Sequence, residues 1–412
     1  MRSMPDPAML PSGMDLVERR KRYQAIEDYR KRPLVVYATS TRANVPAVMA
    51  GDTVRELIDQ IDALGDAKHV DILVHSSGGD ALAAWKLMSI MRERLTHVAV
   101  LVPFHAFSAA TLFCLGADEI VMHPHASLGP IDPQITLNQP DGTKRQFSYE
   151  DVGAFLRFLG GEVKVTEQVH VAAIIEKLFS IVDPVNVGAA KRASELSSDV
   201  GERLLLMHMT SSEDRAKARQ IAENLNKSFF AHGDAVSRKR ARELQLKVAK
   251  DDPKLEGLLW DAYLGVESYM QLREPFNPLH HYLRNAAGAA ALVPPAPLAL
   301  PPDAPPQVVQ QVWNAAGQQA MARLAGNAIE VGYSVVNAIL ESTRLASEFR
   351  TTGKFTASRN PQGAIQLAGT DTDASWKEVK PPQAVQAAPA PPGVAPPAHP
   401  AGPPPTSVPN PS

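Results

Sequence analysis

The chain has 412 residues, which suits one catalytic domain with appendages, because single hydrophobic cores stop growing near roughly 250–300 residues. Hydrophobic residues make up 44% of the chain and charged residues 21%, which excludes a wholly disordered protein and a coiled coil. The formal net charge of −2 gives no overall field that would attract a phosphate backbone, so nucleic acid is not an expected partner.

The N-terminal stretch lacks the basic start and the unbroken apolar segment of a secretory signal, so we expect a cytoplasmic protein. The single cysteine, Cys114, excludes an internal disulfide and a multi-cysteine metal site, and its apolar neighbours predict a buried structural thiol. Residues 98–117 carry no charge over the length of a membrane span. Because polar residues and Pro103 interrupt this stretch, we expect a buried strand, a turn and a buried helix there.

The first predicted element is a helix over 14–32 that ends at Pro33. Its four basic residues at 19–22 could touch anionic lipid or RNA, but a solvated helix face is favoured. Short apolar strands then alternate with helices, in the order 33–40, 52–64, 70–76, 80–95, 97–103, a short helix from 108, and 119–124. This alternation predicts parallel strands with right-handed crossovers, and therefore an α/β core.

In the predicted helix over 80–95, apolar residues recur every three positions and are expected to mark the buried side: Leu82, Trp85, Met88 and Met91. Residues 150–250 are predicted to be mainly helical. A further helix is expected over 308–340, where only Arg323 and Glu330 are charged. Such a helix should dock onto the core or another subunit, with membrane association as the less favoured alternative.

Prolines concentrate in two segments, with seven in residues 294–306 and thirteen in residues 381–412, which predicts linkers or extended tails. The chain is therefore expected to divide into five parts. These are a flexible N-terminus (1–13), a catalytic domain (14–275), a Pro-rich linker (276–307), a C-terminal helical segment (308–355) and a Pro/Ala-rich disordered tail (356–412).

Two strand ends are candidate sites, because ligands in open α/β sheets bind beyond the carboxyl ends of strands. In HSSGGD, the paired Gly78 and Gly79 follow a strand and leave backbone N–H groups uncovered, as a developing oxyanion requires. In FHAFSAAT, Ser108 stands between small residues at a helix start, where its hydroxyl would be accessible. The structural alternatives are a tight turn for the glycines and an N-cap for the serine.

With the segment ADEIVMHPHASLGPIDPQ at 117–134, these strand ends resemble the serine dehydrogenase proteinase family, relatives of signal peptide peptidase A in the Clp protease/crotonase superfamily. The resemblance covers roughly 15–275 and a piece at 341–355. It implies a β-α-β superhelical core, a polypeptide substrate and a homo-oligomer. It also implies that Ser108 is the nucleophile and that the backbone amides of Gly78 or Gly79 and of Ala109 form the oxyanion hole.

The sequence departs from the family pattern at several positions. Ser76-Ser77 replaces Thr-Pro before the glycines, and Ala110 stands where a glycine is common. Where the Clp protease histidine would fall, this chain has Ile131-Asp132, and Asp132 is expected to fix a loop. A general base must still activate the serine, and three candidates are open: Lys144 in a predicted loop, His125 and His232.

A serine peptidase is therefore the favoured function. Two alternatives stay open: acyl-CoA chemistry on the same oxyanion hole, and a catalytically inactive scaffold or interaction protein. No cofactor is expected, because no nucleotide-binding or zinc motif is present. A metal site formed by histidines 75, 105, 123 and 125 is disfavoured, because they do not share one helix face. Peripheral membrane association is the alternative to a purely cytoplasmic location.

Overall fold

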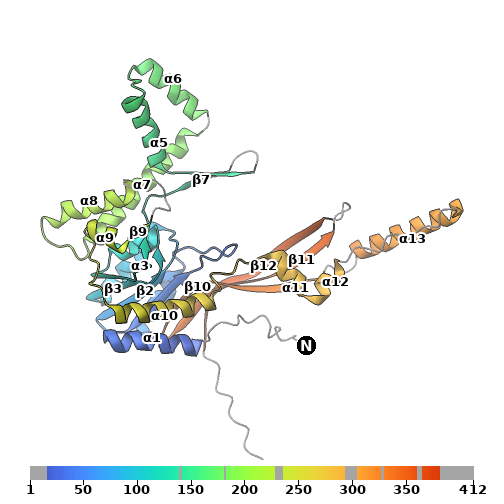
Figure 1. The fold of residues 1–412 in the computed structure, drawn as a ribbon, viewed down its shortest axis with the longest axis horizontal. Helices are drawn as coiled ribbons and strands as arrows, with labels where there is room; N and C mark the ends of the chain where they lie inside the picture. Colours follow the sequence, from blue (N-terminus) through green and yellow to red (C-terminus); the bar gives the residue numbers. More distant parts are fainter. Residues whose placement is uncertain are drawn as a thin grey trace, which may run out of the picture. The chain divides into compact units, whose positions relative to one another are not determined.

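The computed structural model describes residues 16–138, 142–180, 182–227, 235–292, 304–325, 329–359 and 364–380. Its centre is a seven-stranded sheet in the order β12-β11-β10-β1-β2-β3-β5 (Figure 1). Four strands run parallel to one another: β1 (Leu34–Thr39), β2 (His69–His75), β3 (His97–Val102) and β5 (Glu119–Met122). Three antiparallel strands extend the sheet beyond β1: β10 (Val331–Ser342), β11 (Ala346–Arg359) and β12 (Ile365–Glu378).

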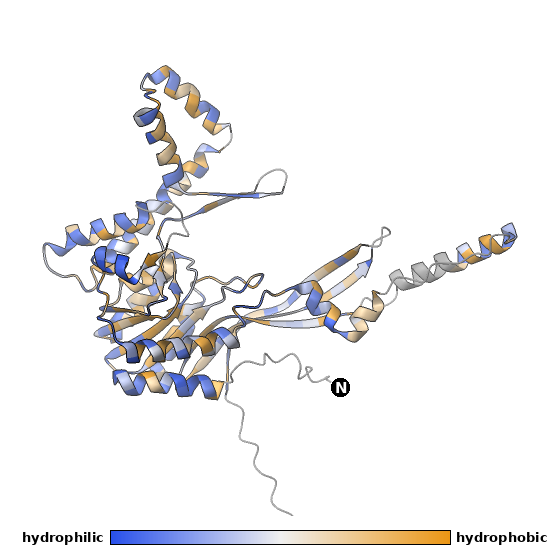
Figure 2. Cartoon of the chain, viewed as in Figure 1, coloured by the Kyte–Doolittle hydropathy of each residue, from blue (hydrophilic) through white to orange (hydrophobic). Residues whose placement is uncertain are grey.

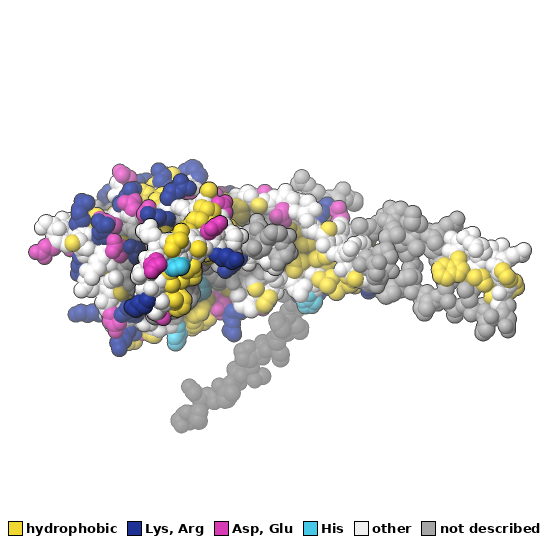
Figure 3. Space-filling view, turned by 90° about the horizontal axis from the view of Figure 1, so that it is seen from above, with side chains coloured by type: hydrophobic (Ala, Val, Ile, Leu, Met, Phe, Trp, Pro, Cys, Tyr) yellow, Lys and Arg dark blue, Asp and Glu magenta, His cyan; other side chains and the backbone are white. Residues whose placement is uncertain are grey.

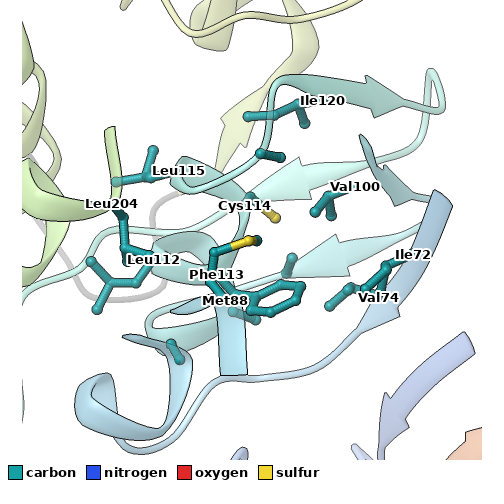
Figure 4. Packing of buried hydrophobic residues seen from close by; sticks show 14 of the residues in the cluster. Ile72, Val74, Met88, Val100, Leu112, Phe113, Cys114, Leu115, Ile120 and Leu204 are labelled. Carbon is teal, nitrogen blue, oxygen red and sulfur yellow. The ribbon is translucent and has the colours of Figure 1, made fainter. Parts of the chain in front are cut away.

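Helices cover both faces of the parallel strands, because successive side chains of a strand point to opposite faces. Val35 of β1 and Val74 of β2 pack on one face, with helices α2 (Thr53–Ala63), α3 (Ala81–Arg94), α4 (Ala109–Leu115) and α7 (Pro184–Leu205). Figure 4 shows Phe113 and Met88 side by side, facing the strands that carry Ile72 and Val74. The other face packs against α1 (Leu16–Arg30) and α10 (Pro253–Tyr269), which lie side by side in Figure 1.

Smaller elements surround this core. A three-stranded sheet joins β4 (His105–Ala106), β6 (Ser127–Leu128) and β9 (Val236–Ser237), and a hairpin joins β7 (Ile135–Asn138) and β8 (Lys144–Phe147). The hairpin leads into α5 (Tyr149–Arg157), a π-helix (Phe158–Glu162) and α6 (Gln168–Phe179). The remaining helices are α8 (Asp214–Lys227), α9 (Arg238–Glu243), α11 (Pro278–Arg284), α12 (Ala286–Ala291) and α13 (Pro306–Ala325).

The predicted α/β alternation is confirmed from β1 to β5, and so is the helical character of residues 150–250. Residues 98–117 form strand, turn and helix, with Cys114 fully buried. Within the described residues, no helix is long and apolar enough to cross a membrane. The predicted buried side of α3 is confirmed for Met88 and Met91, which are buried, and Trp85 is half-buried against the core. It is wrong for Leu82, which is 49% exposed, and it missed Ala84 and Leu87. A spacing of three drifts around a helix of 3.6 residues per turn, and the buried stripe follows the longer period.

The predicted C-terminal helical segment is wrong beyond α13, which ends at Ala325. Residues 331–342 are instead a strand flanked by two others, and the lack of charge over 331–340 reflects burial within a sheet. The predicted disordered tail also begins too early, because β11 and β12 occupy 346–359 and 365–378. The predicted linker contains α11 and α12. Residues 1–13 and 381–412 lie outside the described part of the chain.

The predicted solvated face of the N-terminal helix is confirmed for Lys21, which is exposed, and is wrong for Arg19. Arg19 is 1% exposed and donates two hydrogen bonds of 2.8 Å to Glu341 of β10, itself buried. Tyr23 donates a third hydrogen bond to the same carboxylate, and the Arg19 guanidinium lies 3.7 Å from the Tyr269 ring centroid. Arg19, with Arg20, which donates to Ser342 O (3.1 Å), therefore joins the N-terminal helix to β10.

Candidate active site

The turn between β2 and α3 places two glycines in conformations that other residues rarely adopt. Gly78 has φ of 102° and Gly79 has φ of 151°. Met49 runs alongside, donating its N–H to Gly78 O (2.7 Å) and accepting from the Asp80 N–H (2.9 Å). A Cβ on Gly79 would lie 2.2 Å from the Met49 carbonyl oxygen, so only glycine fits this close approach.

Ser76 ties this turn to the neighbouring strand end. Its hydroxyl accepts a hydrogen bond from the Gly78 N–H (3.0 Å) and lies 2.7 Å from the Thr39 hydroxyl oxygen. Its backbone donates to His105 O (3.1 Å) and accepts from the Phe107 N–H (3.0 Å). The Gly78 N–H is therefore already hydrogen-bonded to Ser76. The Gly79 N–H has no hydrogen-bond partner among the described residues.

Ser108 directly precedes α4 and has φ of 52° and ψ of −118°, a conformation that a residue with a side chain adopts only under strain. It occupies the N-cap position, but its side chain makes no capping hydrogen bond. Ser148 and Asp252, at the same position of other helices, do cap with their side chains. Within the described chain, the Ser108 hydroxyl has no hydrogen-bond partner. The N-cap alternative therefore does not explain this serine.

The two strand ends meet at Gly78 and Ser108. A Cβ placed on Gly78 would lie 2.6 Å from Ser108 Cβ and 3.0 Å from the Ala109 nitrogen. The Ala109 N–H, the first of α4, also has no hydrogen-bond partner among the described residues. Ala110 is fully buried in the core, so its methyl group packs away from solvent. This arrangement brings the Ser108 hydroxyl and the Ala109 N–H against the glycine turn. Within the described residues, neither of them nor the Gly79 N–H has a hydrogen-bond partner.

The base candidates are not brought to Ser108 by any contact within the described residues. Lys144 is exposed and opens β8 opposite Asn138, so its predicted loop position is wrong. His125 is exposed, with its ring 5.3 Å from that of Trp260. Asp132 is buried and accepts a hydrogen bond from Gln134 (2.9 Å), as expected of a residue that fixes a loop. His232 lies outside the described residues.

Aromatic residues of α10 near this site were not predicted from the sequence. The His75 ring lies 4.4 Å from the His105 ring and 5.1 Å from the Tyr263 ring. Burial lowers the pKa of His105 to about 4 and moves the pKa of His75 well below its ordinary value. Among the described residues, no group of three ligating side chains could hold a metal ion. The spacing of Trp260 and Tyr263, three apart on a helix, was the available signal.

The part of the chain that holds this site is similar to a known protein family. Residues 45–145 match the family of ClpP-like SDH-type serine proteinases. Two uncharacterized proteins of Methanocaldococcus jannaschii, MJ0137 and MJ1495, are each 26% identical to this chain, over 52% and 50% of its length. These matches span 64% and 61% of the relatives, less than two thirds of each.

Solved structures with similarity to the chain include the 1510-N membrane-bound stomatin-specific protease, at 15% identity and a TM-score of 0.33. That match covers 54% of this chain and 83% of the other. ClpP1 from Listeria monocytogenes is 14% identical, with a TM-score of 0.30 over 56% of this chain and 98% of its own. The parallel sheet and the family match confirm the predicted Clp protease-like α/β fold. The resemblance inferred from the two strand ends is likewise confirmed, because residues 45–145 match the ClpP-like SDH-type serine proteinase family.

Proposed function

We propose that this protein is a serine peptidase in which Ser108 is the nucleophile. One observation carries the proposal: Ser108 is held in a strained conformation against the glycine turn, with its hydroxyl uncommitted. Strained residues cluster at active sites because the surrounding structure must hold them in place. The strand-to-helix position also exposes a serine hydroxyl, as the nucleophile turns of other hydrolases do.

The backbone supplies the oxyanion hole in this proposal. When Ser108 Oγ attacks a peptide carbonyl, its proton passes to the general base, the C–O π bond opens and negative charge develops on the carbonyl oxygen. When the π bond re-forms, the C–N bond breaks and the amine leaves with that proton; water then hydrolyses the acyl-enzyme. We assign the N–H groups of Gly79 and Ala109 to the carbonyl oxygen, because the Gly78 N–H already binds Ser76. Each such donor contributes roughly 10²–10³ in rate.

The general base is one of Lys144, His125 and His232 in this proposal. Substitution of each candidate in turn separates them, because only the loss of the base removes the proton acceptor that Ser108 requires. The base is the one residue of the three whose substitution abolishes peptidase activity while the other two variants remain active. The chemistry needs no cofactor.

The substrate is a polypeptide, and the chain forms a homo-oligomer in the cytoplasm. The helices α5 and α6 support self-association, because neither has a buried residue and apolar side chains of this region reach solvent: Leu156 (43% exposed), Phe158 (47%) and Val169 (69%). Both helices mix hydrophobic and hydrophilic residues in Figure 2, and Figure 3 shows a hydrophobic stripe from above. Light scattering of the purified protein measures the oligomer order.

Labelling with a fluorophosphonate probe, followed by mass spectrometry of the labelled peptide, tests the nucleophile. We expect modification at Ser108 in the wild type and none in Ser108→Ala. Ser77→Ala is the matched control, because Ser77 is exposed on the same turn and should leave labelling unchanged. Absence of labelling in folded wild type would favour the inactive scaffold. Acyl-CoA chemistry would be favoured by CoA turnover that survives Ser108→Ala.

A further inference from the structure

The hydroxyl of Thr111 is buried in the first turn of α4 and contacts three backbone groups. Its oxygen lies 2.7 Å from Ala106 O and 2.9 Å from Gly129 O, and it accepts a hydrogen bond from the Gly129 N–H (3.0 Å). All three residues are buried. A hydroxyl has one proton and two lone pairs, so the two carbonyl oxygens share the proton while a lone pair binds the N–H. Neither the nucleophile nor the oxyanion hole of the proposed mechanism includes Thr111.

The Ala106 acceptor is an unusual partner for a threonine in a helix. The hydroxyl of a helical threonine ordinarily bonds to the carbonyl three or four residues earlier, which here belongs to Ser108 or Phe107. Thr111 instead reaches the carbonyl of Ala106, which precedes the helix and lies on the other side of Ser108 in the chain. This hydrogen bond therefore closes residues 106–111 into a loop that contains Ser108. We call it the serine loop.

The contacts with Gly129 fix the serine loop to the neighbouring strand. Gly129 directly follows β6, whose Leu128 pairs with Ala106 of β4. A Cβ on Gly129 would lie 2.9 Å from Phe107 Cγ, so the two chain segments approach closely just before Ser108. The Thr111 hydroxyl thus joins the end of β4, the residue after β6 and the first turn of α4.

The serine loop accounts for the persistence of strain at Ser108. A residue stays at φ of 52° and ψ of −118° only where the surrounding contacts hold it there. Ser108 does not hold itself, because its side chain makes no capping hydrogen bond. Two contacts span it instead: the Ala110 N–H donates to Phe107 O (2.9 Å), and the Thr111 hydroxyl bonds to Ala106 O.

We propose that Thr111 is a positioning residue, whose hydroxyl holds Ser108 in the strained conformation from which Oγ attacks the substrate carbonyl. This inference rests on the proposed function, in which Ser108 is the nucleophile. Thr111 acts through the serine loop and not on the substrate. Without the hydroxyl, buried backbone groups of Ala106 and Gly129 would lose a partner, and the loop would relax. A displacement of about 1 Å at a reacting group lowers the rate by about 10²-fold.

The kinetics of fluorophosphonate labelling in Thr111→Val and Thr111→Ser test this role. Valine keeps the shape of threonine without the hydroxyl, and serine keeps the hydroxyl without the methyl group. We expect the maximal labelling rate constant to fall by about 10- to 100-fold in Thr111→Val, with the probe affinity and the Thr111→Ser variant within about threefold of wild type. Thr53→Val is the matched control, because Thr53 is also buried and its hydroxyl oxygen lies 3.1 Å from that of Tyr37.

Amide hydrogen exchange, followed by mass spectrometry of peptides from the serine loop and from β6, reports the loop without catalysis. We expect exchange at Ala110 and Gly129 to be about 10-fold faster in Thr111→Val than in wild type, and unchanged in Thr111→Ser and Thr53→Val. This measurement separates the two proposals. If wild type is not labelled, the nucleophile assignment fails, and exchange alone then decides whether Thr111 holds the loop: faster exchange in Thr111→Val supports this, and unchanged exchange overturns it.

Slower labelling and faster exchange in Thr111→Val, both restored in Thr111→Ser, support the positioning role. Labelling of Thr111→Val at the wild-type rate overturns it, and so does an equal loss in Thr53→Val, which would reflect a general loss of stability. If Thr111→Val does not fold, Gly129→Ala tests the same loop, because its Cβ would force Phe107 and Gly129 apart. Slower labelling of that variant supports the inference, and an unchanged rate overturns it.

Discussion

Two polar sites of this protein differ in burial and in hydrogen bonding: one is buried, and the other is open to solvent at Gly79 and half-buried at Ser108. Where α1 meets β10, Arg19, Tyr23 and Glu341 are all buried and satisfy one another's hydrogen bonds. Where β2 and α4 meet, the Ser108 hydroxyl and the Gly79 N–H have no partner in the described chain, and the backbone is strained. The first site is complete without a ligand, and the second is not.

The contrast teaches how to separate structural from functional polar groups. A buried charge without a partner is strongly unfavourable, so evolution of a stable fold pairs it. A strained residue is unfavourable too, and such residues cluster at functional sites. At the second site Gly79 is exposed and Ser108 is half-buried, so their unused hydrogen-bonding groups are open to a reacting molecule. Substitutions at the first site should therefore change stability, and substitutions at the second should change reactivity.

The largest effect is expected for Glu341→Ala, which leaves the Arg19 guanidinium buried without its carboxylate. We expect the free energy of unfolding to fall by about 3–5 kcal/mol, measured by urea denaturation. Fluorophosphonate labelling per folded molecule should stay unchanged. Glu330→Ala is the matched control, because the Lys354–Glu330 pair is about half exposed and should contribute under about 1 kcal/mol. Equal losses of unfolding free energy in the two variants would show that the buried ion pair contributes no more to stability than the exposed one.

Gly79→Ala should act on reactivity. The new Cβ would displace Met49 and move the Gly79 N–H, so the labelling rate of Ser108 should fall by about 10²–10³. Gly65→Ala controls for backbone strain, because Gly65 has φ of 63° and no atom lies within 4 Å of the position that a Cβ would take there. Labelling that stays within about threefold in Gly79→Ala would remove this N–H from the oxyanion hole.

Acid should lower the free energy of unfolding through His105, which is partly buried beside His75. The pKa of His105 is about 4 when folded and near about 6.5 when unfolded, so the unfolded chain binds more protons between these values. Stability is therefore present above about pH 6.5 and falls as the pH drops toward about 4, by about 1–3 kcal/mol. His105→Gln should flatten this slope in pH-dependent unfolding, whereas His170→Gln, exposed on α6, should not. An unchanged slope in His105→Gln contradicts the assignment.

Ser76→Ala is expected to have the smallest effect of the series. It removes the acceptor of the Gly78 N–H and the partner of Thr39, a loss of about 1 kcal/mol. Labelling should slow by several-fold because the glycine turn loosens. Thermal unfolding and labelling rates of Ser77→Ala provide the comparison at the neighbouring exposed serine. A larger effect in Ser77→Ala would show that the turn is held differently.

The core and the two strand ends could be predicted from sequence because local patterns determine them. Short apolar runs, paired glycines and a serine at a helix start are visible without knowing any distant contact. The fate of Arg19 could not be predicted, because its partner Glu341 lies 322 residues away in the chain. The same reason explains why β10 was not predicted: its residues 331–340 carry no charge and resemble a docked helix until the pairing of β10 with β1 is known.

The residues of the candidate site also divide into those that local sequence predicts and those that depend on the fold. Gly78, Gly79 and Ser108 follow from motif and position, and their mutual approach follows from parallel strands that end at one edge. The strain at Ser108 and the commitment of the Gly78 N–H to Ser76 depend on backbone angles that no spacing reveals. Trp260 and Tyr263 lie on a helix far along the sequence, so their position near the site could not be predicted without the fold.

The pairing of β1 with β10 has a consequence for biosynthesis. The ribosome makes β1 and its parallel partners early, but residues 331–342 appear nearly 300 residues after Thr39. At about 5–20 residues per second, roughly 15–60 seconds pass before the open edge of β1 can be paired. During that interval the nascent chain presents an exposed β-strand edge to other chains. Slow synthesis or a truncated message should therefore increase aggregation, and a chaperone that shields strand edges should reduce it.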